Sequence, residues 1–250
     1  MKMMLASAMA LTMAGCGSNK QSDSAETTYA CRMIDYYDYS TPVPAAETVD
    51  DSYFQDTFFG GDSRMGSLYL YSDLRDKGAE IYYAESMRVY TMDTMPVQEL
   101  DGKTTLAELL DKTEKKNIYL LLGINEIRSD NFDDWASYYD EEVIQPILKR
   151  MPDAHIYLML NYHVREVTGL DTETLDQHLK MINDKMIEIA KKNHIYYLDV
   201  DDEMTDTDGM IKEEYVWDGL HFNVEGAEAY ADYIARHTVK EDAYVKEVCE

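Results

Sequence analysis

Three short stretches of this chain carry side chains that together could cleave an ester. The first is GGDS, which ends at Ser63, the second is GIN, which ends at Asn125, and the third is DGLH, which runs from Asp218 to His221. A serine hydroxyl becomes a strong nucleophile when an imidazole removes its proton, and a carboxylate orients that imidazole and stabilises its charged form. An amide N–H can hold the oxyanion that forms when the serine attacks a carbonyl carbon. These residue types therefore indicate acyl transfer through an acyl-serine intermediate.

The elements that must position these side chains alternate between strand and helix from about residue 53. Apolar or aromatic runs predict buried strands at residues 53–59, 80–83, 118–122, 155–160 and 195–200. Helical spacing predicts helices at residues 104–116, 130–150, 172–192 and 224–237, and Pro146 should kink or split the second of these. We therefore expect an α/β fold, a three-layer α/β/α sandwich with a mostly parallel central sheet of about five strands. Ligands of such sheets bind at the carboxyl ends of the strands.

The three stretches, in this order, resemble the blocks of the SGNH (GDSL-like) hydrolase family over roughly residues 53–237. The resemblance implies an SGNH or flavodoxin-like fold and a serine esterase that needs no metal and no other cofactor. Ser63 would be the nucleophile, His221 the base and then the acid, and Asp218 the carboxylate that orients the histidine. The backbone N–H of Ser63, at the start of a helix, and the side chain of Asn125 would hold the oxyanion.

Two positions depart from the family pattern. Glu126 stands where members usually have an aspartate after the asparagine, and we expect it to be tolerated because that residue supports the site rather than reacts. The second block normally offers a glycine N–H as a third oxyanion donor, but residues 84–87, with the sequence AESM, contain no glycine. We expect the backbone N–H of Ser86 to take this role.

Two residues beside the reactive groups are candidates for substrate contacts. Arg64 directly follows Ser63 and could contact an anionic group of the substrate, or could instead pair with a carboxylate. Trp217 precedes Asp218 and is expected to line the pocket. No metal site is expected, because the acidic residues 199–209 lack the register of a calcium loop and the remaining histidines lack ligand spacing.

The N-terminus predicts export. Lys2 precedes a short apolar run that ends in small residues, which is typical of a signal peptide over residues 1–15 and too short for a lasting membrane span. The next residue, Cys16, resembles the lipidated cysteine of bacterial lipoproteins, and an ordinary cleavable signal is the alternative. We expect a protein outside the cytoplasm, anchored to the bacterial cell membrane by lipid or secreted.

The rest of the chain divides into a tether, a domain and a tail. Residues 16–50 are rich in Ser, Thr and Asp and are expected to form a flexible tether. Residues 51–240 would form the hydrolase domain, and residues 241–250 a C-terminal tail. Cys31 and Cys249 lie near opposite ends of the mature chain and could form a disulfide or remain free thiols.

Charge restricts the partners. The 250 residues include 49 acidic and 23 basic side chains, a net charge of −26, so nucleic acids and anionic membrane surfaces would be repelled. A membrane contact is expected only through the lipid anchor, and the oligomeric state is left open. The expected partner is a small acyl ester, such as an O-acetyl ester, or an acylated glycan. An O-acyltransferase that uses the same triad, or a surface lipoprotein that binds glycan without catalysis, are the alternatives.

Overall fold

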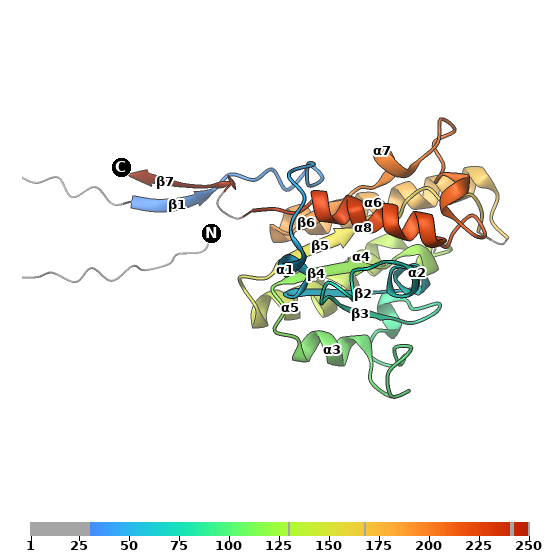
Figure 1. The fold of residues 1–250 in the computed structure, drawn as a ribbon, viewed down its shortest axis with the longest axis horizontal. Helices are drawn as coiled ribbons and strands as arrows, with labels where there is room; N and C mark the ends of the chain where they lie inside the picture. Colours follow the sequence, from blue (N-terminus) through green and yellow to red (C-terminus); the bar gives the residue numbers. More distant parts are fainter. Residues whose placement is uncertain (1–30, 130, 168, 241–242, 250) are drawn as a thin grey trace, which may run out of the picture.

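The central feature of the computed structural model is a parallel sheet of five strands in the order β3-β2-β4-β5-β6. The structure describes residues 31–129, 131–167, 169–240 and 243–249. The strands of the sheet are β2 (Thr57–Gly61), β3 (Glu80–Tyr83), β4 (Asn117–Leu121), β5 (His155–Met159) and β6 (Tyr196–Leu198). The predicted three-layer α/β sandwich is confirmed (Figure 1).

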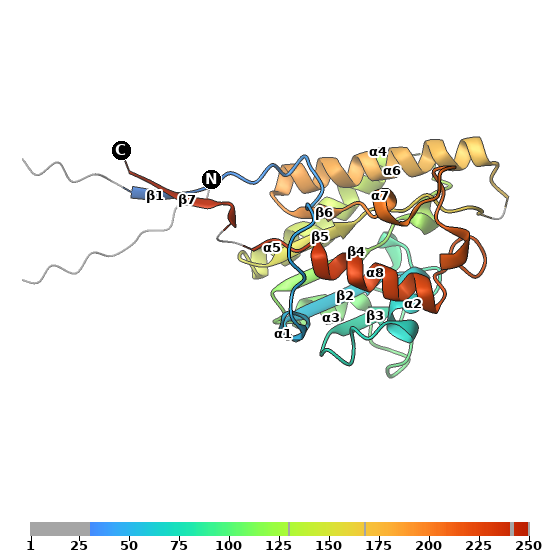
Figure 2. The same cartoon turned by 45° about the horizontal axis from the view of Figure 1, so that its top comes forward.

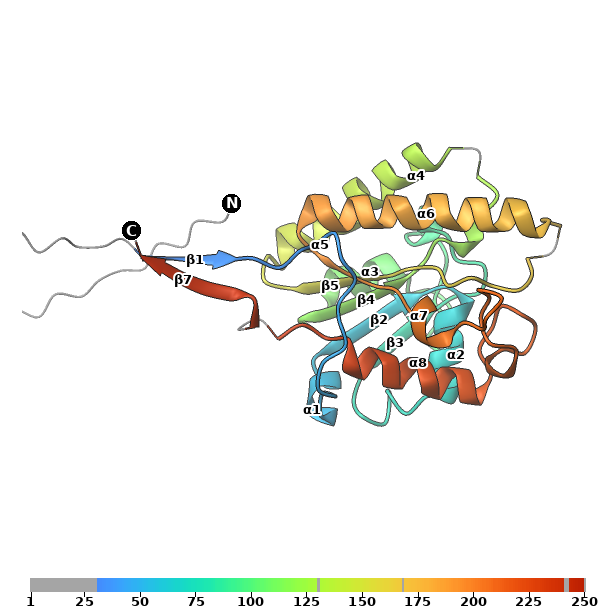
Figure 3. The ribbon, with the colours of Figure 1, turned by 90° about the horizontal axis from the view of Figure 1, so that it is seen from above.

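Both faces of the sheet are covered by helices. The helices are α1 (Asp51–Phe54), α2 (Ser63–Tyr71), α3 (Leu106–Lys112), α4 (Phe132–Tyr138), α5 (Gln145–Arg150), α6 (Thr172–Asn193), α7 (Asp201–Met204) and α8 (Val224–Arg236). Helices α2 and α8 pack on one face, and α3, α4, α5 and most of α6 on the other (Figure 3). Neighbouring residues of a strand therefore enter different cores, as Phe58 and Phe59 do. No helix of the described residues has the length and apolar character needed to cross a membrane.

Short helical turns link these elements. They are the 3-10 helices η1 (Val89–Thr91), η2 (Ile124–Glu126) and η4 (Glu213–Tyr215), and the π-helical segment η3 (Tyr139–Ile144). The long helix expected at residues 130–150 is divided by η3, which ends one residue before α5 and two before Pro146. Because proline lacks an N–H, it cannot continue a regular α-helical ladder, and the chain accommodates Pro146 through this π-helical segment while the helix continues without a break. The first strand of the sheet begins at Thr57 rather than at residue 53. The residues before it form the short helix α1, which the side chain of Asp50 caps.

The first and last described strands pair with each other outside the sandwich. Strand β1 (Cys31–Asp35) pairs antiparallel with β7 (Val245–Cys249), and this two-stranded ribbon projects from the side of the sheet where the strands begin (Figures 1 and 2). Cys31 is disulfide-bonded, and the pairing places the backbone of Cys249 directly opposite it. The predicted C-terminal tail thus contains a strand. The predicted signal peptide and Cys16 lie outside the described residues.

The flexible tether expected up to residue 50 is wrong for residues 36–50, which run along the domain. Tyr37 and Val43 are buried, and the Val43 N–H donates a hydrogen bond to the Tyr197 carbonyl at 3.0 Å. Farther along, the Val49 N–H donates to the Ala235 carbonyl at 2.9 Å. The segment is polar in composition, but Tyr37 and Val43 belong to the core between the sheet and α8, and Tyr39 and Val49 pack against that core.

Stacked tyrosines hold this segment in place. The rings of Tyr119 and Tyr157, on neighbouring strands, lie parallel with centroids 4.3 Å apart. Tyr196 of β6 extends the row, and Tyr37 packs against it edge-on with centroids 5.1 Å apart. On its other side Tyr37 meets Tyr244, which leads into β7. Aromatic pairs of this kind add about 0.5–1.5 kcal/mol each beyond their buried area.

Candidate active site

Three adjacent strand ends form the floor of the site. Gly61 at the end of β2 is in register with Tyr83 of β3 on one side and Leu121 of β4 on the other. The Asp62 N–H then donates to the Leu121 carbonyl, and the Ala84 N–H to the Gly61 carbonyl. The residues that follow these ends within a few positions are Ser63, Ser86 and Asn125. The sheet therefore brings three of the predicted site residues to one edge.

The turn that carries Ser63 is tight and capped. A Cβ added at Gly61 would lie 2.4 Å from the Leu121 carbonyl oxygen, so the strands leave no room for a side chain there. Helix α2 starts at Ser63, and the Asp62 side chain caps it by accepting the Arg64 N–H at 3.0 Å. Ser63 therefore sits in the first helical turn, where backbone N–H groups have no partner inside the helix.

A chain of hydrogen bonds links Ser63, His221 and Asp218. The Ser63 Oγ lies 2.8 Å from His221 Nε2, and His221 Nδ1 lies 2.8 Å from Asp218 Oδ2. The other carboxylate oxygen, Oδ1, accepts the backbone N–H groups of His221 and Leu220 at 2.8 and 3.0 Å. Burial alone would raise the pKa of Asp218, but the hydrogen bonds it accepts, chiefly from His221, outweigh that effect and lower the pKa. Asp218 is thus a carboxylate at neutral pH, although 56% of its side chain is exposed.

The loop that carries His221 is held from beneath by residues after β5. The Tyr162 hydroxyl donates to the Leu220 carbonyl at 2.7 Å, and the Arg165 N–H donates to the Gly219 carbonyl at 2.8 Å. The loop also closes on itself, since the Trp217 N–H donates to the His221 carbonyl at 2.9 Å. Sequence analysis missed the support from Tyr162. Its only sequence signal is an aromatic residue just past a strand end, which is also typical of core packing.

Asn125 is hydrogen-bonded to the segment that directly follows Ser86. The Asn125 side-chain amide donates one hydrogen bond to the Met87 carbonyl at 2.9 Å, and an amide carries a second N–H. Ser86 has φ = +60°, in the left-handed region that favours glycine. This is the segment where the family pattern has its glycine, and the serine adopts a conformation in which glycine would be unstrained.

Arg64 does not reach the site surface, so its predicted substrate contact is wrong. Its side chain is fully buried, and it binds Asp62 through Nε to Oδ1 at 3.0 Å and Nη2 to Oδ2 at 2.8 Å. The guanidinium carbon also lies 5.5 Å from the centre of the Tyr162 ring. The carboxylate pairing considered as the alternative is what the structure shows. Because α2 packs on the sheet at this residue, the charge is buried and needs a paired carboxylate.

Trp217 is 67% exposed beside Asp218, so its predicted role in lining the pocket stays a prediction.

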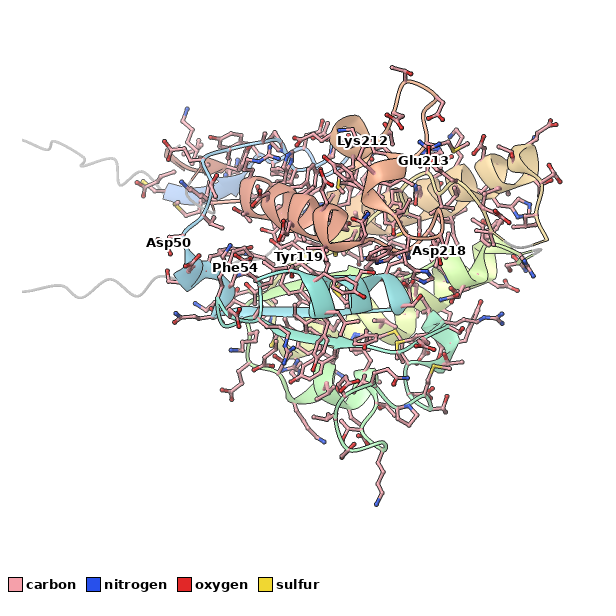
Figure 4. All side chains as sticks on the ribbon, turned by 45° about the vertical axis from the view of Figure 1, so that its right-hand side comes forward. Asp50, Phe54, Tyr119, Lys212, Glu213 and Asp218 are labelled. Atoms are coloured by element: carbon pink, nitrogen blue, oxygen red, sulfur yellow. The ribbon has the colours of Figure 1, made fainter. Side chains whose placement is uncertain are left out.

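Figure 4 shows at which end of the sheet the site lies. Asp50, just before α1, and Asp218 lie at opposite ends of the domain, with Tyr119 between them. The reactive side chains therefore gather at the end of the sheet where the strands finish. Within the residues that the structure describes, no group of three or more His, Cys, Asp or Glu side chains is arranged to hold a metal ion.

Comparison with known proteins places the chain among hydrolases of one family. The profile of the GDSL-like Lipase/Acylhydrolase family matches residues 51–229. No curated protein matches the chain in sequence.

Solved structures share the fold. A Streptococcus pneumoniae protein provisionally described as a platelet activating factor is 22% identical, with a TM-score of 0.52 over 70% of this chain and 80% of that one. A GDSL-like lipase from Bacteroides thetaiotaomicron is 15% identical, with a TM-score of 0.52 over 72% and 84%. A Bacteroides fragilis protein provisionally described as an acylhydrolase is 14% identical, with a TM-score of 0.52 over 72% and 83%. At these identities the similarity shows a common architecture.

Proposed function

The chain belongs to the GDSL-like lipase/acylhydrolase family and is a carboxylic ester hydrolase, and from that premise we propose that it is a serine esterase with Ser63 as its nucleophile. The observation that carries this proposal is the unbroken series of hydrogen bonds from Ser63 through His221 to Asp218. A serine, an imidazole and a carboxylate joined in this order are the parts that nucleophilic acyl transfer requires.

The reaction follows from this geometry. Nε2 of His221 accepts the Ser63 proton as Oγ attacks the ester carbonyl, and Asp218 stabilises the imidazolium through Nδ1. The tetrahedral intermediate collapses when the imidazolium gives its proton to the departing alcohol oxygen, which leaves an acyl-Ser63. A water molecule then attacks this ester while His221 again takes the proton. The acid leaves, and the serine hydroxyl is restored.

The developing oxyanion needs hydrogen-bond donors, and we assign three groups to this role. The backbone N–H of Ser63 lies in the first turn of α2, where the helix dipole also favours negative charge. The second N–H of the Asn125 amide and the backbone N–H of Ser86 would complete the oxyanion hole. Each donor stabilises the transition state by several kilocalories per mole more than it stabilises the bound substrate. This difference lowers the barrier and raises kcat.

The proposed substrate is a small acyl ester, an O-acetyl group on a glycan. A net charge of −26 favours neutral or cationic substrates, and the exposed Trp217 offers a flat apolar face beside Asp218 for a sugar ring. The joined Ser63 and His221 favour a reactive site over one that only binds glycan. If a sugar hydroxyl rather than water attacked the acyl-Ser63 intermediate, the enzyme would transfer the acyl group to that sugar instead of hydrolysing the ester.

A fluorophosphonate probe tests nucleophile and activation together. We expect the purified domain to hydrolyse p-nitrophenyl acetate and to be labelled on the peptide that contains Ser63, because the probe reacts with activated serines. Prior denaturation, which separates Ser63 from His221, should abolish labelling. Label on another serine peptide, or no label on a folded domain, would contradict the proposal.

We further propose that the protein is exported and anchored through lipid on Cys16. The Ala-Gly-Cys sequence after a short apolar run supports this localisation. Whole cells grown with radiolabelled palmitate should incorporate label into the wild type and lose it in Cys16→Ala. Equal label in both would rule out the anchor and leave secretion as the alternative.

A further inference from the structure

Glu126 is a buried carboxyl group that the proposed reaction does not use. Only 5% of the residue is exposed, and its Oε1 accepts the backbone N–H of Val89 at 2.6 Å. The preceding residue, Asn125, donates its side-chain amide to the carbonyl of Met87. Two consecutive side chains of η2 thus hold the segment that follows Ser86, one through a carbonyl and one through an N–H.

That segment needs outside support. A left-handed conformation at a non-glycine residue such as Ser86 is unfavourable, so neighbouring contacts must maintain it. The turn closes through a bond from the Met87 N–H to the Ala84 carbonyl at 3.3 Å. Beyond the turn, the short charge-assisted bond to Glu126 fixes Val89 at the start of η1. Without these anchors, the Ser86 N–H would be free to turn away from the oxyanion.

Charged and titratable groups surround the Glu126 carboxyl on several sides. Asp62 faces it from the turn after β2, and Arg88 and Tyr90 from the segment around η1. Tyr139 of η3, which is fully buried, lies on another side. Burial raises the pKa of Glu126 to about 7, the Val89 N–H opposes that shift, and the negative charge of Asp62 adds to it.

We propose that Glu126 is a positioning residue, whose ionised carboxylate fixes residues 86–89 so that the Ser86 N–H faces the oxyanion. The inference rests on the proposed function, since it assumes that the Ser86 N–H is a donor of the oxyanion hole. A protonated carboxyl accepts a weaker hydrogen bond than a carboxylate does. Hydrolysis is therefore lost in part as pH falls through the neutral range and the Glu126 carboxylate takes up a proton.

Stability responds in the opposite direction. The pKa of Glu126 is higher in the folded than in the unfolded chain, so between about pH 4.5 and 7 the unfolded state binds fewer protons. The fold consequently loses stability as pH rises through this window, and above it the buried charge is a standing cost. The ionised form that supports catalysis is thus the form that weakens the fold.

Glu126→Gln separates these two effects, because the amide oxygen still accepts the Val89 N–H but carries no charge. Above pH 7 we expect kcat for p-nitrophenyl acetate to fall by about 5–10-fold with KM nearly unchanged, and the midpoint of thermal unfolding to rise. The acid limb of the kcat profile should become shallower, since one titrating group is removed. Glu126→Asp, which restores the charge on a shorter stem, should recover part of kcat and the steeper limb.

The matched control is Glu85→Gln, which removes the same charge from an exposed residue beside Ser86. It should leave kcat, the slope of the profile and the unfolding midpoint unchanged. A merely structural role for Glu126 predicts instead that kcat and the unfolding midpoint of Glu126→Gln fall together. That result, or an unchanged acid limb, would overturn the proposal.

The amide signal of Val89 in NMR spectra gives a readout that does not depend on turnover. In the wild type its chemical shift should move with pH about a neutral midpoint, and in Glu126→Gln this titration should vanish. A Val89 signal that does not respond to pH would overturn the positioning role whatever the activity. A wild type with a titrating Val89 but no esterase activity would support the Glu126 contact and sink the proposed function instead.

Discussion

Ser63→Ala should lower kcat/KM for p-nitrophenyl acetate by about 10⁵-fold and abolish fluorophosphonate labelling. The hydroxyl oxygen is the only atom that the substitution removes, and it is the atom that lies 2.8 Å from His221 Nε2. The oxyanion donors remain, so a small residual rate above the uncatalysed reaction is expected. Thermal unfolding should change little, because alanine is well accommodated in the first turn of α2.

A second serine on the same helix provides the control. Ser67 is buried one helical turn after Ser63, and Ser67→Ala removes a hydroxyl in the same element without touching His221. Its kcat/KM should stay close to that of the wild type. Wild-type turnover in Ser63→Ala, measured on protein free of contaminating esterase, would mean that the ester is cleaved by another group.

Asn125→Ala should lower kcat by about 10²–10³-fold with a much smaller change in KM. The amide is expected to contact the substrate oxygen most strongly once that oxygen carries negative charge, so its loss raises the barrier without greatly weakening binding. The variant should also lose about 1 kcal/mol of unfolding free energy, since the bond to the Met87 carbonyl disappears. Steady-state kinetics and thermal unfolding measure the two effects separately.

Ser86→Ala is the comparison for Asn125→Ala. The donor assigned to Ser86 is its backbone N–H, which alanine retains, so kcat should change by no more than about twofold. A fall as deep as that of Asn125→Ala would show that the serine hydroxyl matters and that the assignment of the backbone donor is wrong. A normal rate in Asn125→Ala would remove the amide from the oxyanion hole.

The sheet and the order of the reactive residues could be predicted because both are local in the sequence. Buried parallel strands are short apolar runs, and Ser63 and Asn125 follow the ends of two such strands within a few positions. Asp218 and His221 are three residues apart, so one loop suffices to join the carboxylate to the imidazole.

Other features could not be predicted because they depend on contacts between distant segments. Whether Arg64 points to solvent or to Asp62 is decided by how α2 packs on the sheet, and a helix of nine residues has no clear sequence signal for that choice. The support of the His221 loop by Tyr162 joins residues 58 positions apart. The hold of Glu126 on Val89 likewise joins two loops that sequence analysis treats separately.

Residues 36–50 show a different limit. Their composition is that of a linker, and composition alone predicts flexibility. Tyrosine is amphipathic, however, so Tyr37 can be buried among other rings without making the segment look apolar. Pairing of β1 with β7 across more than two hundred residues has no local signal at all.

The ribbon of β1 and β7 also determines how the enzyme can be attached to other things. The first and last described segments of the chain form it, on the side of the domain away from Asp218 (Figure 4). A resin, a sensor chip or a fused protein joined at this ribbon would therefore leave the approach to the reactive hydroxyl open.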